Sequence, residues 1–315
     1  METEELKQLA ERTRFMREAG IALLAASGLL GLFLLVPMPQ RAASETETAL
    51  ASAKTSPAFT DVPVEAKAAI VYDLATGNTL YAKNADAQLP LASLTKLLTV
   101  YAALKELPPE SLVTIPRTAT TLDAPRIFKA GQRLSLSDLA RLTLTASLND
   151  GAAAIAEAAA VRSNRSESVL LASAAASLSL SQTYAMNGSG LDVNEAVSGG
   201  YGSARDLARL SGAFAQELPY IAEATTLPYA EASSADGASF TVKNTDPIIS
   251  SVPHILLSKT GFTDLAGGNL SLVFDVGIGH PIAVVVLGSS KEARFTDGAA
   301  LVAATLAHFA GVPSL

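Results

Sequence analysis

Residues 68–104 read AAIVYDLATGNTLYAKNADAQLPLASLTKLLTVYAAL, and this stretch contains the signals that decide the fold class. Ala68–Asp73 and Thr79–Lys83 have the composition of strands, and Gly77-Asn78 between them favours a tight turn, so a β-hairpin is predicted. The segment Leu91–Leu104 that follows has apolar residues on nearly every side. Such a pattern is typical of a buried helix, so strands and a buried helix are expected in one domain.

Helical and strand patterns segregate along the rest of the chain. Helices are predicted at 139–145, 150–161, 166–180, 204–217 and 292–309. Strands are predicted at 240–243, 255–259, 269–276 and 282–287. Strands at both ends with helices between them indicate an α+β domain, an antiparallel sheet flanked by helices with a helical lobe. The N-terminal hairpin is expected to complete a sheet made mostly by C-terminal strands.

Composition excludes several classes of protein. The chain has 315 residues, a net charge of −7, 49% hydrophobic residues and no Cys. The apolar fraction excludes a disordered chain, and the missing Cys excludes disulfides and thiolate metal sites. The acidic balance argues against nucleic acid as the main partner, since a basic stripe is the usual footprint of phosphate binding.

An uncharged apolar run at 19–36 predicts export. Its eighteen residues span about 27 Å as a helix, close to the thickness of a bilayer core. Basic residues gather on its N-terminal side, which predicts residues 1–18 in the cytoplasm and the remainder outside. We therefore expect a single-pass anchor at 19–36 in a bacterial cell membrane, a flexible linker at 37–61 and an extracytoplasmic catalytic domain at 62–315. A cleavable signal peptide is the alternative.

Ser93 and Lys96 stand three residues apart at the start of the buried helix. This spacing places the hydroxyl and the amine on one helix face. A serine hydroxyl becomes nucleophilic when an adjacent base takes its proton, and burial lowers the pKa of a lysine enough for it to act as that base. A chance S-x-x-K match is the alternative, but a lysine in an apolar helix is costly unless it is paired.

Two further motifs carry compatible groups. Ser147-Leu148-Asn149 lies between two predicted helices, and the alternative is that Asn149 or Asp150 only caps the second of them. Lys259-Thr260-Gly261 ends a predicted strand; its Lys and Thr suit a carboxylate, although an ordinary turn would use the same residues. Each of S-x-x-K, S-x-N and K-T-G occurs once, in this order, as in penicillin-binding proteins and class A β-lactamases.

From about residue 65 onward the chain resembles the D-alanyl-D-alanine carboxypeptidases, low-molecular-mass penicillin-binding proteins of the serine peptidase type. Outside the opening stretch, the resemblance rests on SLNDGAAAIAE (147–157), MNGSGLD (186–192), SARDLARLSGAF (203–214) and KTGFTDLAGGNL (259–270). It implies a DD-peptidase fold like that of β-lactamases. It also implies trimming of the terminal D-alanine from peptidoglycan stem peptides, without cofactor or metal, and covalent inhibition by β-lactam antibiotics.

The resemblance implies four catalytic residues. Ser93 attacks the carbonyl carbon between the two D-alanines, and Lys96 takes the proton of Ser93. Ser147 relays a proton to the leaving amine. Asn149 positions Lys96 and the substrate amide.

The third motif carries the residues that the resemblance assigns to substrate binding. Lys259 and Thr260 bind the terminal carboxylate, and Gly261 lets the substrate approach the strand. The backbone N–H groups of Phe262 and Ser93 form the oxyanion hole. The chain departs from the family pattern at Leu148, where Gly is usual, and it shows no counterpart of the extra Arg that some relatives use for the carboxylate.

Other functions remain as alternatives. A D,D-endopeptidase would use the same site to cut cross-links. A class A β-lactamase needs a deacylating Glu in an E-x-x-L-N-type loop, and no such pattern lies between Ser147 and Lys259. A non-catalytic wall-binding protein would not need the intact motifs. A Ser-His-Asp hydrolase is disfavoured because no G-x-S-x-G occurs.

Overall fold

The computed structural model describes residues 57–311. The predicted anchor at 19–36 and most of the predicted linker lie outside this part of the chain. Within it, no helix is both long and apolar enough to cross a membrane. A short 3₁₀ helix at Pro57–Phe59 buries Phe59 against the rings of Tyr81 and His308, so folded structure begins a few residues before the expected start at 62.

A five-stranded antiparallel sheet forms the centre of the domain. Its order is β10-β11-β12-β1-β2. The strands are β1 (Ala68–Asp73), β2 (Thr79–Lys83), β10 (Ile255–Thr263), β11 (Gly267–Asp275) and β12 (Pro281–Ser289). Because β1 pairs with β12, the N-terminal hairpin completes a sheet of C-terminal strands, and that prediction is confirmed.

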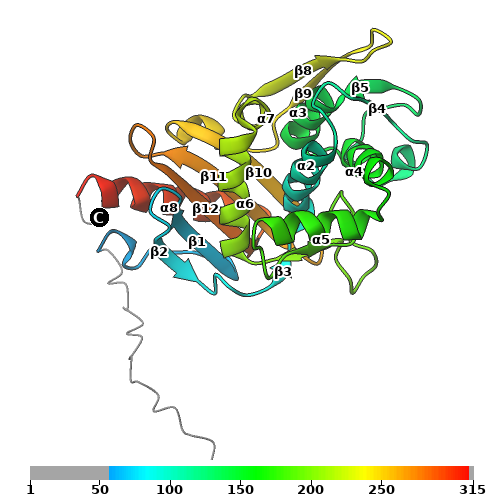
Figure 1. The fold of residues 1–315 in the computed structure, drawn as a ribbon. Coiled ribbons are helices and arrows are strands. Elements are labelled where there is room, and N and C mark those ends of the chain that lie inside the picture. Colours follow the sequence, from blue (N-terminus) through cyan, green and yellow to red (C-terminus); the bar gives the residue numbers. More distant parts are fainter. Residues whose placement is uncertain (1–56, 312–315) are drawn as a thin grey trace, which may run out of the picture. The chain divides into compact units, whose positions relative to one another are not determined.

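Both faces of this sheet are buried at its central strands, which explains why β12 is apolar along most of its length. In β12, Ile282, Val284 and Val286 join one core cluster, with Leu301 and Val302 of α8 (Ala293–Phe309). The alternate residues of β12 join a second cluster under α6 (Ala204–Glu217). Successive side chains of a strand point to opposite faces, so seven of the nine residues of β12 are buried. Figure 1 shows α6 and α8 on the two sides of the sheet.

The remaining long helices form a lobe beside the sheet (Figure 1). They are α2 (Thr95–Glu106), α3 (Leu136–Ala146), α4 (Asn149–Ser163) and α5 (Glu167–Ser177). Nine of the twelve residues of α2 are buried, because the helix lies between the lobe and the sheet. The expected α+β architecture with a helical lobe is therefore confirmed. The helix predicted from Leu91 differs, since its first turn is a 3₁₀ helix at Ala92–Leu94.

Short elements connect these layers. They are α7 (Pro219–Ala224), β3 (Leu89–Pro90), β4 (Leu112–Thr114), β5 (Arg133–Ser135), β6 (Tyr184–Ala185), β7 (Gly200–Gly202), β8 (Tyr229–Ser233) and β9 (Ser239–Lys243), with 3₁₀ turns at Ala119–Thr121 and Ile249–Ser251. β3 pairs with β7 immediately before the nucleophile segment. The segment that carries Ser93 is thereby joined to the loop that precedes α6.

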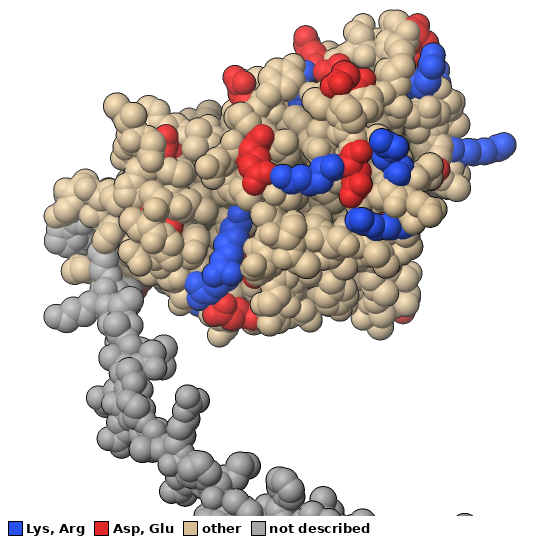
Figure 2. Space-filling model, viewed as in Figure 1, with Lys and Arg blue, Asp and Glu red and all other residues tan. Residues whose placement is uncertain are grey.

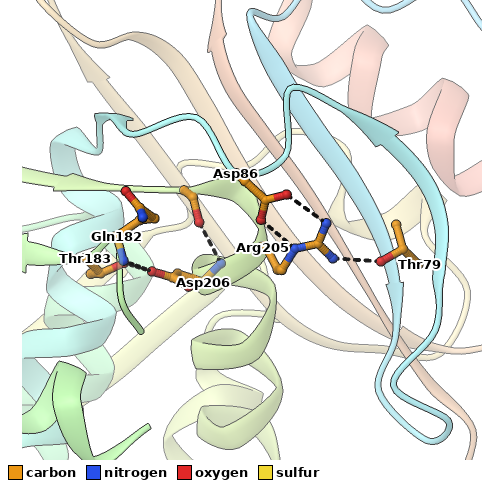
Figure 3. Close-up of polar contacts among 7 residues, drawn as sticks. Thr79, Asp86, Gln182, Thr183, Arg205 and Asp206 are labelled. Atoms are coloured by element: carbon orange, nitrogen blue, oxygen red, sulfur yellow. Dashed lines mark hydrogen bonds and ion pairs between the residues drawn. The ribbon is translucent and has the colours of Figure 1, made fainter. Parts of the chain in front are cut away.

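Residues in the first turn of α6 connect the β1–β2 hairpin to the helical lobe (Figure 3). Arg205 donates to both carboxylate oxygens of Asp86, at 2.6 and 3.1 Å, and to Thr79 Oγ1 at 2.7 Å. The neighbouring Asp206 accepts hydrogen bonds from Gln182 N and from Thr183 Oγ1. Bidentate guanidinium–carboxylate pairs are directional. This pair therefore fixes the path of the chain between β2 and β3, which leads to Ser93.

Candidate active site

Ser93 lies on a tight turn rather than inside a regular helix. Ala92 before it has a φ of 48°, a left-handed conformation that costs a residue with a Cβ about 1–2 kcal/mol. The turn is held from two sides, because Leu91 N donates to Gly200 O at 2.9 Å and Asn269 Nδ2 donates to Pro90 O at 3.0 Å. Strain of this kind is often found where a functional side chain must be aimed.

Lys96 is fully buried and has three polar neighbours. Its Nζ lies 2.7 Å from Ser93 Oγ, 2.8 Å from Asn149 Oδ1 and 2.7 Å from Ser189 O. The amide oxygen and the carbonyl can only accept. A neutral amine would donate to both of these and direct its lone pair at the Ser93 hydroxyl. This arrangement suits removal of the proton from Ser93.

Electrostatics favour the neutral form of Lys96. Burial lowers its pKa well below the usual value, and the nearby charge of Lys259 lowers it further. The Asp150 carboxylate acts in the opposite direction and only partly offsets these effects. A lysine with a strongly lowered pKa beside a serine hydroxyl is the combination that nucleophilic catalysis requires.

Asn149 begins α4 and is almost completely buried. Its Oδ1 faces Lys96, which identifies the other amide atom as nitrogen. That nitrogen donates to Asp123 O at 2.9 Å and to Ala124 O at 3.1 Å. Both amide hydrogens thus have partners in the protein. The geometry fits the expected positioning of Lys96, whereas the expected contact with the substrate amide would require one of these bonds to be released.

Ser147 ends α3 in the left-handed conformation, with a φ of 58°. Its Oγ accepts a hydrogen bond of 2.9 Å from Lys259 Nζ, which also donates to Thr260 O at 2.7 Å. The side chain of Leu148 is 1% exposed and packs in the core. The Leu148 side chain therefore contributes to the apolar core and does not obstruct access to the Ser93 and Ser147 hydroxyls.

Lys259 is the second buried amine of the site. Its pKa is lowered to about 7, mainly by burial and also by the charge of Arg294, while the Asp246 carboxylate opposes both. Arg294 is itself buried and donates from Nη1 to Gly261 O at 2.6 Å. The sequence did not single out Arg294 because it is on α8, far along the chain from the motif it supports. No local pattern around it indicates this contact.

Gly261 brings the third motif against the nucleophile turn. A Cβ at this position would lie 3.0 Å from Leu91 O and 3.2 Å from Ser93 N. Because β10 is an edge strand of the sheet, its backbone at Gly261 and Phe262 runs beside Ser93 with no strand between. The Phe262 side chain is 41% exposed and leaves the adjoining space open.

Thr260 has a partner that the sequence did not indicate. Its Oγ1 lies 2.6 Å from Thr245 Oγ1, so two hydroxyls sit side by side near Lys259. Three stretches that are distant in sequence thus meet in one cluster of hydroxyls, amines and an amide. Among residues 57–311 no group of His, Cys, Asp and Glu could hold a metal ion.

Comparisons with known proteins identify the family of the chain. The D-alanyl-D-alanine carboxypeptidase family, peptidase family S11, matches residues 52–291. A D-alanyl-D-alanine endopeptidase of Pseudomonas aeruginosa is 30% identical over 240 residues, which cover 74% of each chain. The carboxypeptidase DacD of Salmonella typhimurium is 31% identical over 245 residues, 73% of this chain and 60% of that relative.

A solved structure extends the likeness to three dimensions. The penicillin-binding protein D2 of Listeria monocytogenes, in its ampicillin-bound form, is 28% identical. It superposes with a TM-score of 0.64, over 76% of this chain and 98% of that structure. The expected DD-peptidase fold is therefore confirmed. With its family matched from residue 52 to residue 291, the chain belongs to the D-alanyl-D-alanine carboxypeptidase family of serine peptidases.

Proposed function

We propose that this protein is a serine-type D-Ala-D-Ala carboxypeptidase that trims the terminal D-alanine from peptidoglycan stem peptides. The observation that carries the proposal is the 2.7 Å contact between Lys96 Nζ and Ser93 Oγ inside a buried pocket of acceptors. An amine of strongly lowered pKa at this distance is a competent general base.

Acylation would use both serine–lysine pairs. The terminal carboxylate binds the Lys259 ammonium and the Thr260 hydroxyl. Ser93 Oγ attacks the carbonyl carbon of the penultimate D-alanine while its proton passes to Lys96. The oxyanion is stabilised by the N–H groups of Ser93 and Phe262, each worth about 3 kcal/mol in comparable sites. The C–N bond then breaks, and the proton that Lys96 accepted passes through Ser147 to the leaving amine, so that Lys96 is neutral again.

Deacylation would reverse the roles of the same groups. Water attacks the ester carbonyl carbon, and Lys96 accepts one of its protons. The C–O bond to Ser93 then breaks, and Ser93 recovers its proton from Lys96. Penicillins would acylate Ser93 in the same way and remain attached. The ampicillin-bound structure of the Listeria relative supports this expectation of penicillin binding.

A second candidate is a D,D-endopeptidase that cuts cross-links with the same residues. The Pseudomonas relative, matched over 74% of both chains, carries that name. Digestion of purified muropeptides by the full chain separates the two activities. Release of D-alanine from pentapeptide monomers supports the carboxypeptidase, while conversion of cross-linked dimers to monomers supports the endopeptidase.

The acyl-enzyme itself is tested by mass spectrometry after incubation with benzylpenicillin. We expect one adduct, located on Ser93 by peptide mapping, that persists for longer than the substrate turnover time. Ser93→Ala should abolish the adduct, and Ser290→Ala, a control at an exposed serine, should not. An adduct on Ser93→Ala would contradict the assignment, and rapid sustained hydrolysis would favour a β-lactamase.

We also propose that residues 19–36 anchor the protein in the bacterial cell membrane with the catalytic domain outside. The apolar run and the basic residues before it support this placement. Protease added to intact spheroplasts should degrade residues 57–311 of the native chain. Protection of this region until lysis would contradict the proposed orientation.

A further inference from the structure

Arg294, near the start of α8, is a buried cation beside the third motif. Its side chain is 8% exposed, and its Nη1 donates to Gly261 O at 2.6 Å. Burying a guanidinium costs free energy unless its charge is compensated. Within residues 57–311 no carboxylate forms a direct ion pair with Arg294, and its Nε has no hydrogen-bond partner. The guanidinium is therefore held by a backbone carbonyl of the active site.

Several other arginines are paired with carboxylates. Arg205 contacts Asp86, and Arg165 contacts Glu106. Figure 2 shows basic and acidic side chains lying next to one another over the helical lobe and α6. Exposed ion pairs of this kind contribute little free energy. Arg294 differs from them in both its burial and its partner, which indicates a more specific role.

The carbonyl that Arg294 contacts belongs to the same peptide unit as a proposed oxyanion donor. Gly261 C=O and Phe262 N–H are joined by one peptide bond, so they lie in one plane and, in the trans form, point in opposite directions. The N–H therefore points away from Arg294. A Cβ added at Gly261 would lie 3.2 Å from Ser93 N, which is the other proposed donor. This peptide unit thus lies directly beside the place where the oxyanion would form.

A positive charge at the carbonyl oxygen changes the N–H at the other end of the peptide unit. An arginine side chain keeps its charge in proteins, and a hydrogen bond from it is stronger than one between neutral groups. Linked hydrogen bonds polarise one another, so the bond to Gly261 O should make Phe262 N–H a better donor. The same bond fixes the plane of the peptide. Oxyanion holes are effective because their donors are oriented before the charge develops.

We propose that Arg294 is a positioning residue for acyl transfer, which orients and polarises the Gly261–Phe262 peptide so that its N–H stabilises the oxyanion. The inference rests on the proposed function, since it needs the oxyanion to form beside Phe262 N. Both acylation and deacylation pass through an oxyanion, so Arg294 should affect both steps. It should not contribute to substrate binding.

The first test is Arg294→Met, which removes the charge and the donor but keeps an unbranched side chain. With an N-acetylated peptide that ends in D-Ala-D-Ala, kcat for D-alanine release should fall about tenfold, less than the loss of about a hundredfold or more that follows removal of a whole oxyanion donor. KM should not rise. The charge of Arg294 lowers the pKa of Lys259, so its removal leaves more ammonium to bind the substrate carboxylate. A general disruption of the site would instead raise KM.

An infrared spectrum of the acyl-enzyme gives a readout that a merely structural role would not change. Benzylpenicillin labelled with ¹³C at its lactam carbonyl forms an ester with Ser93, and hydrogen bonds to the ester oxygen lower the C=O stretching frequency. In Arg294→Met this band should move to higher wavenumber. Arg294→Lys keeps a positive donor and should restore part of both the rate and the band position. Arg162→Met makes the same substitution at an exposed position on α4 and should leave kcat, KM and the band unchanged.

The outcomes separate this inference from the proposed function. A lower kcat without a higher KM, together with the shifted band, supports the role of Arg294. An unchanged kcat, a raised KM or an unshifted band overturns it and leaves the carboxypeptidase proposal intact. If the unmodified protein neither releases D-alanine nor reacts with benzylpenicillin, both proposals fail. Circular dichroism establishes that the variant is folded, and if Arg294→Met does not fold, Arg294→Gln makes the same comparison with a polar side chain that lacks the charge.

Discussion

The Asp246 carboxylate favours the charged form of Lys259, and its replacement by Asn should shift the pH dependence of the enzyme. The Asp246 side chain is buried beneath β10, where it accepts hydrogen bonds from Ser258 Oγ at 2.6 Å and from Ile248 N at 2.9 Å. Its negative charge raises the pKa of Lys259 against the effects of burial and of Arg294. Asp246→Asn removes this charge, so the pKa of Lys259 should fall below about 7.

The magnitude follows from that pKa. A group of pKa about 7 is about 90% protonated at pH 6 and about 10% protonated at pH 8. The free enzyme needs the ammonium form of Lys259 to bind the terminal carboxylate of the substrate. The alkaline limb of kcat/KM should therefore fall about tenfold between pH 6 and pH 8. In Asp246→Asn the same limb should begin at lower pH, because less ammonium is present at every pH.

The assay is kcat/KM for D-alanine release between pH 6 and pH 9 at constant ionic strength. The acid limb, which we assign to Lys96, should move less, because Asp246 is not among the charges that act directly on Lys96. The alkaline limb of kcat alone should lie higher than that of kcat/KM, since a bound carboxylate stabilises the ammonium form. Circular dichroism of the variant establishes that it remains folded.

Asp61→Asn provides a matched control, because it makes the same chemical change at an exposed position outside the site. It should leave both limbs in place. An alkaline limb that stays fixed in Asp246→Asn, or moves to higher pH, would refute the assignment of that limb to Lys259. An unmodified protein with no alkaline limb below pH 9 would do the same.

Three further changes test the support of the site and the fold. Asp150→Asn should lower the free energy of unfolding in urea by about 3 kcal/mol, because the fully buried carboxylate accepts three backbone N–H bonds; a loss below 0.5 kcal/mol would contradict this. Gly190→Ala should slow acylation by benzylpenicillin about a hundredfold, since its Cβ would lie 2.0 Å from Ala92 O in a backbone of φ +73°; unchanged acylation would show that the turn tolerates the displacement. Burial raises the pKa of Asp73, but hydrogen bonds with His280, Thr76 and Ala75 together outweigh burial and the net pKa is lowered. Asp73 therefore stabilises the fold above its unfolded pKa, and the Tm advantage over Asp73→Asn at pH 7 should shrink as the pH falls through the folded pKa, whereas a constant advantage would argue against this linkage.

The long helices and strands were predicted well, because their apolar patterns extend over many residues. The helix at 204–217 matches the prediction, because Ser203 caps it and an apolar stripe follows. The C-terminal strands were recognisable because they are buried on both faces and read as apolar runs. β10 nevertheless continues to Thr263, beyond its predicted end at 259. Gly261 obscured this extension, since strand propensity disfavours glycine while pairing with β11 tolerates it.

Short elements were predicted less well. β3, β6 and β7 have two or three residues each, too few for any periodicity to appear. Their pairing is still important, because it holds the turn that carries Ser93. α7 spans six residues and was likewise not recognised. Tertiary contacts determine such elements, so a single sequence contains little information about them.

The chemical groups of the site were easier to recognise than their surroundings. Residue type and spacing singled out Ser93 and Lys96, but Ser189 contributes only a backbone carbonyl, which every residue has. Arg294 and Asp246 act through burial and charge on Lys259, and neither property is visible before the chain folds. The left-handed conformations of Ala92 and Ser147 are equally hidden, since propensity favours glycine or asparagine there.

The two lysines of the site have different roles, and each faces a serine on or next to a left-handed turn. Each serine hydroxyl faces one buried amine, Ser93 with Lys96 at 2.7 Å and Ser147 with Lys259 at 2.9 Å. The charge of Lys259 lowers the pKa of Lys96, so the state with both amines protonated is disfavoured. Asp246 supports the charge on Lys259. We infer that Lys96 serves as the base because Lys259 holds the shared positive charge, so a substitution that neutralises Lys259 should raise the pKa of Lys96 and leave less of it in the neutral form that can take the Ser93 proton.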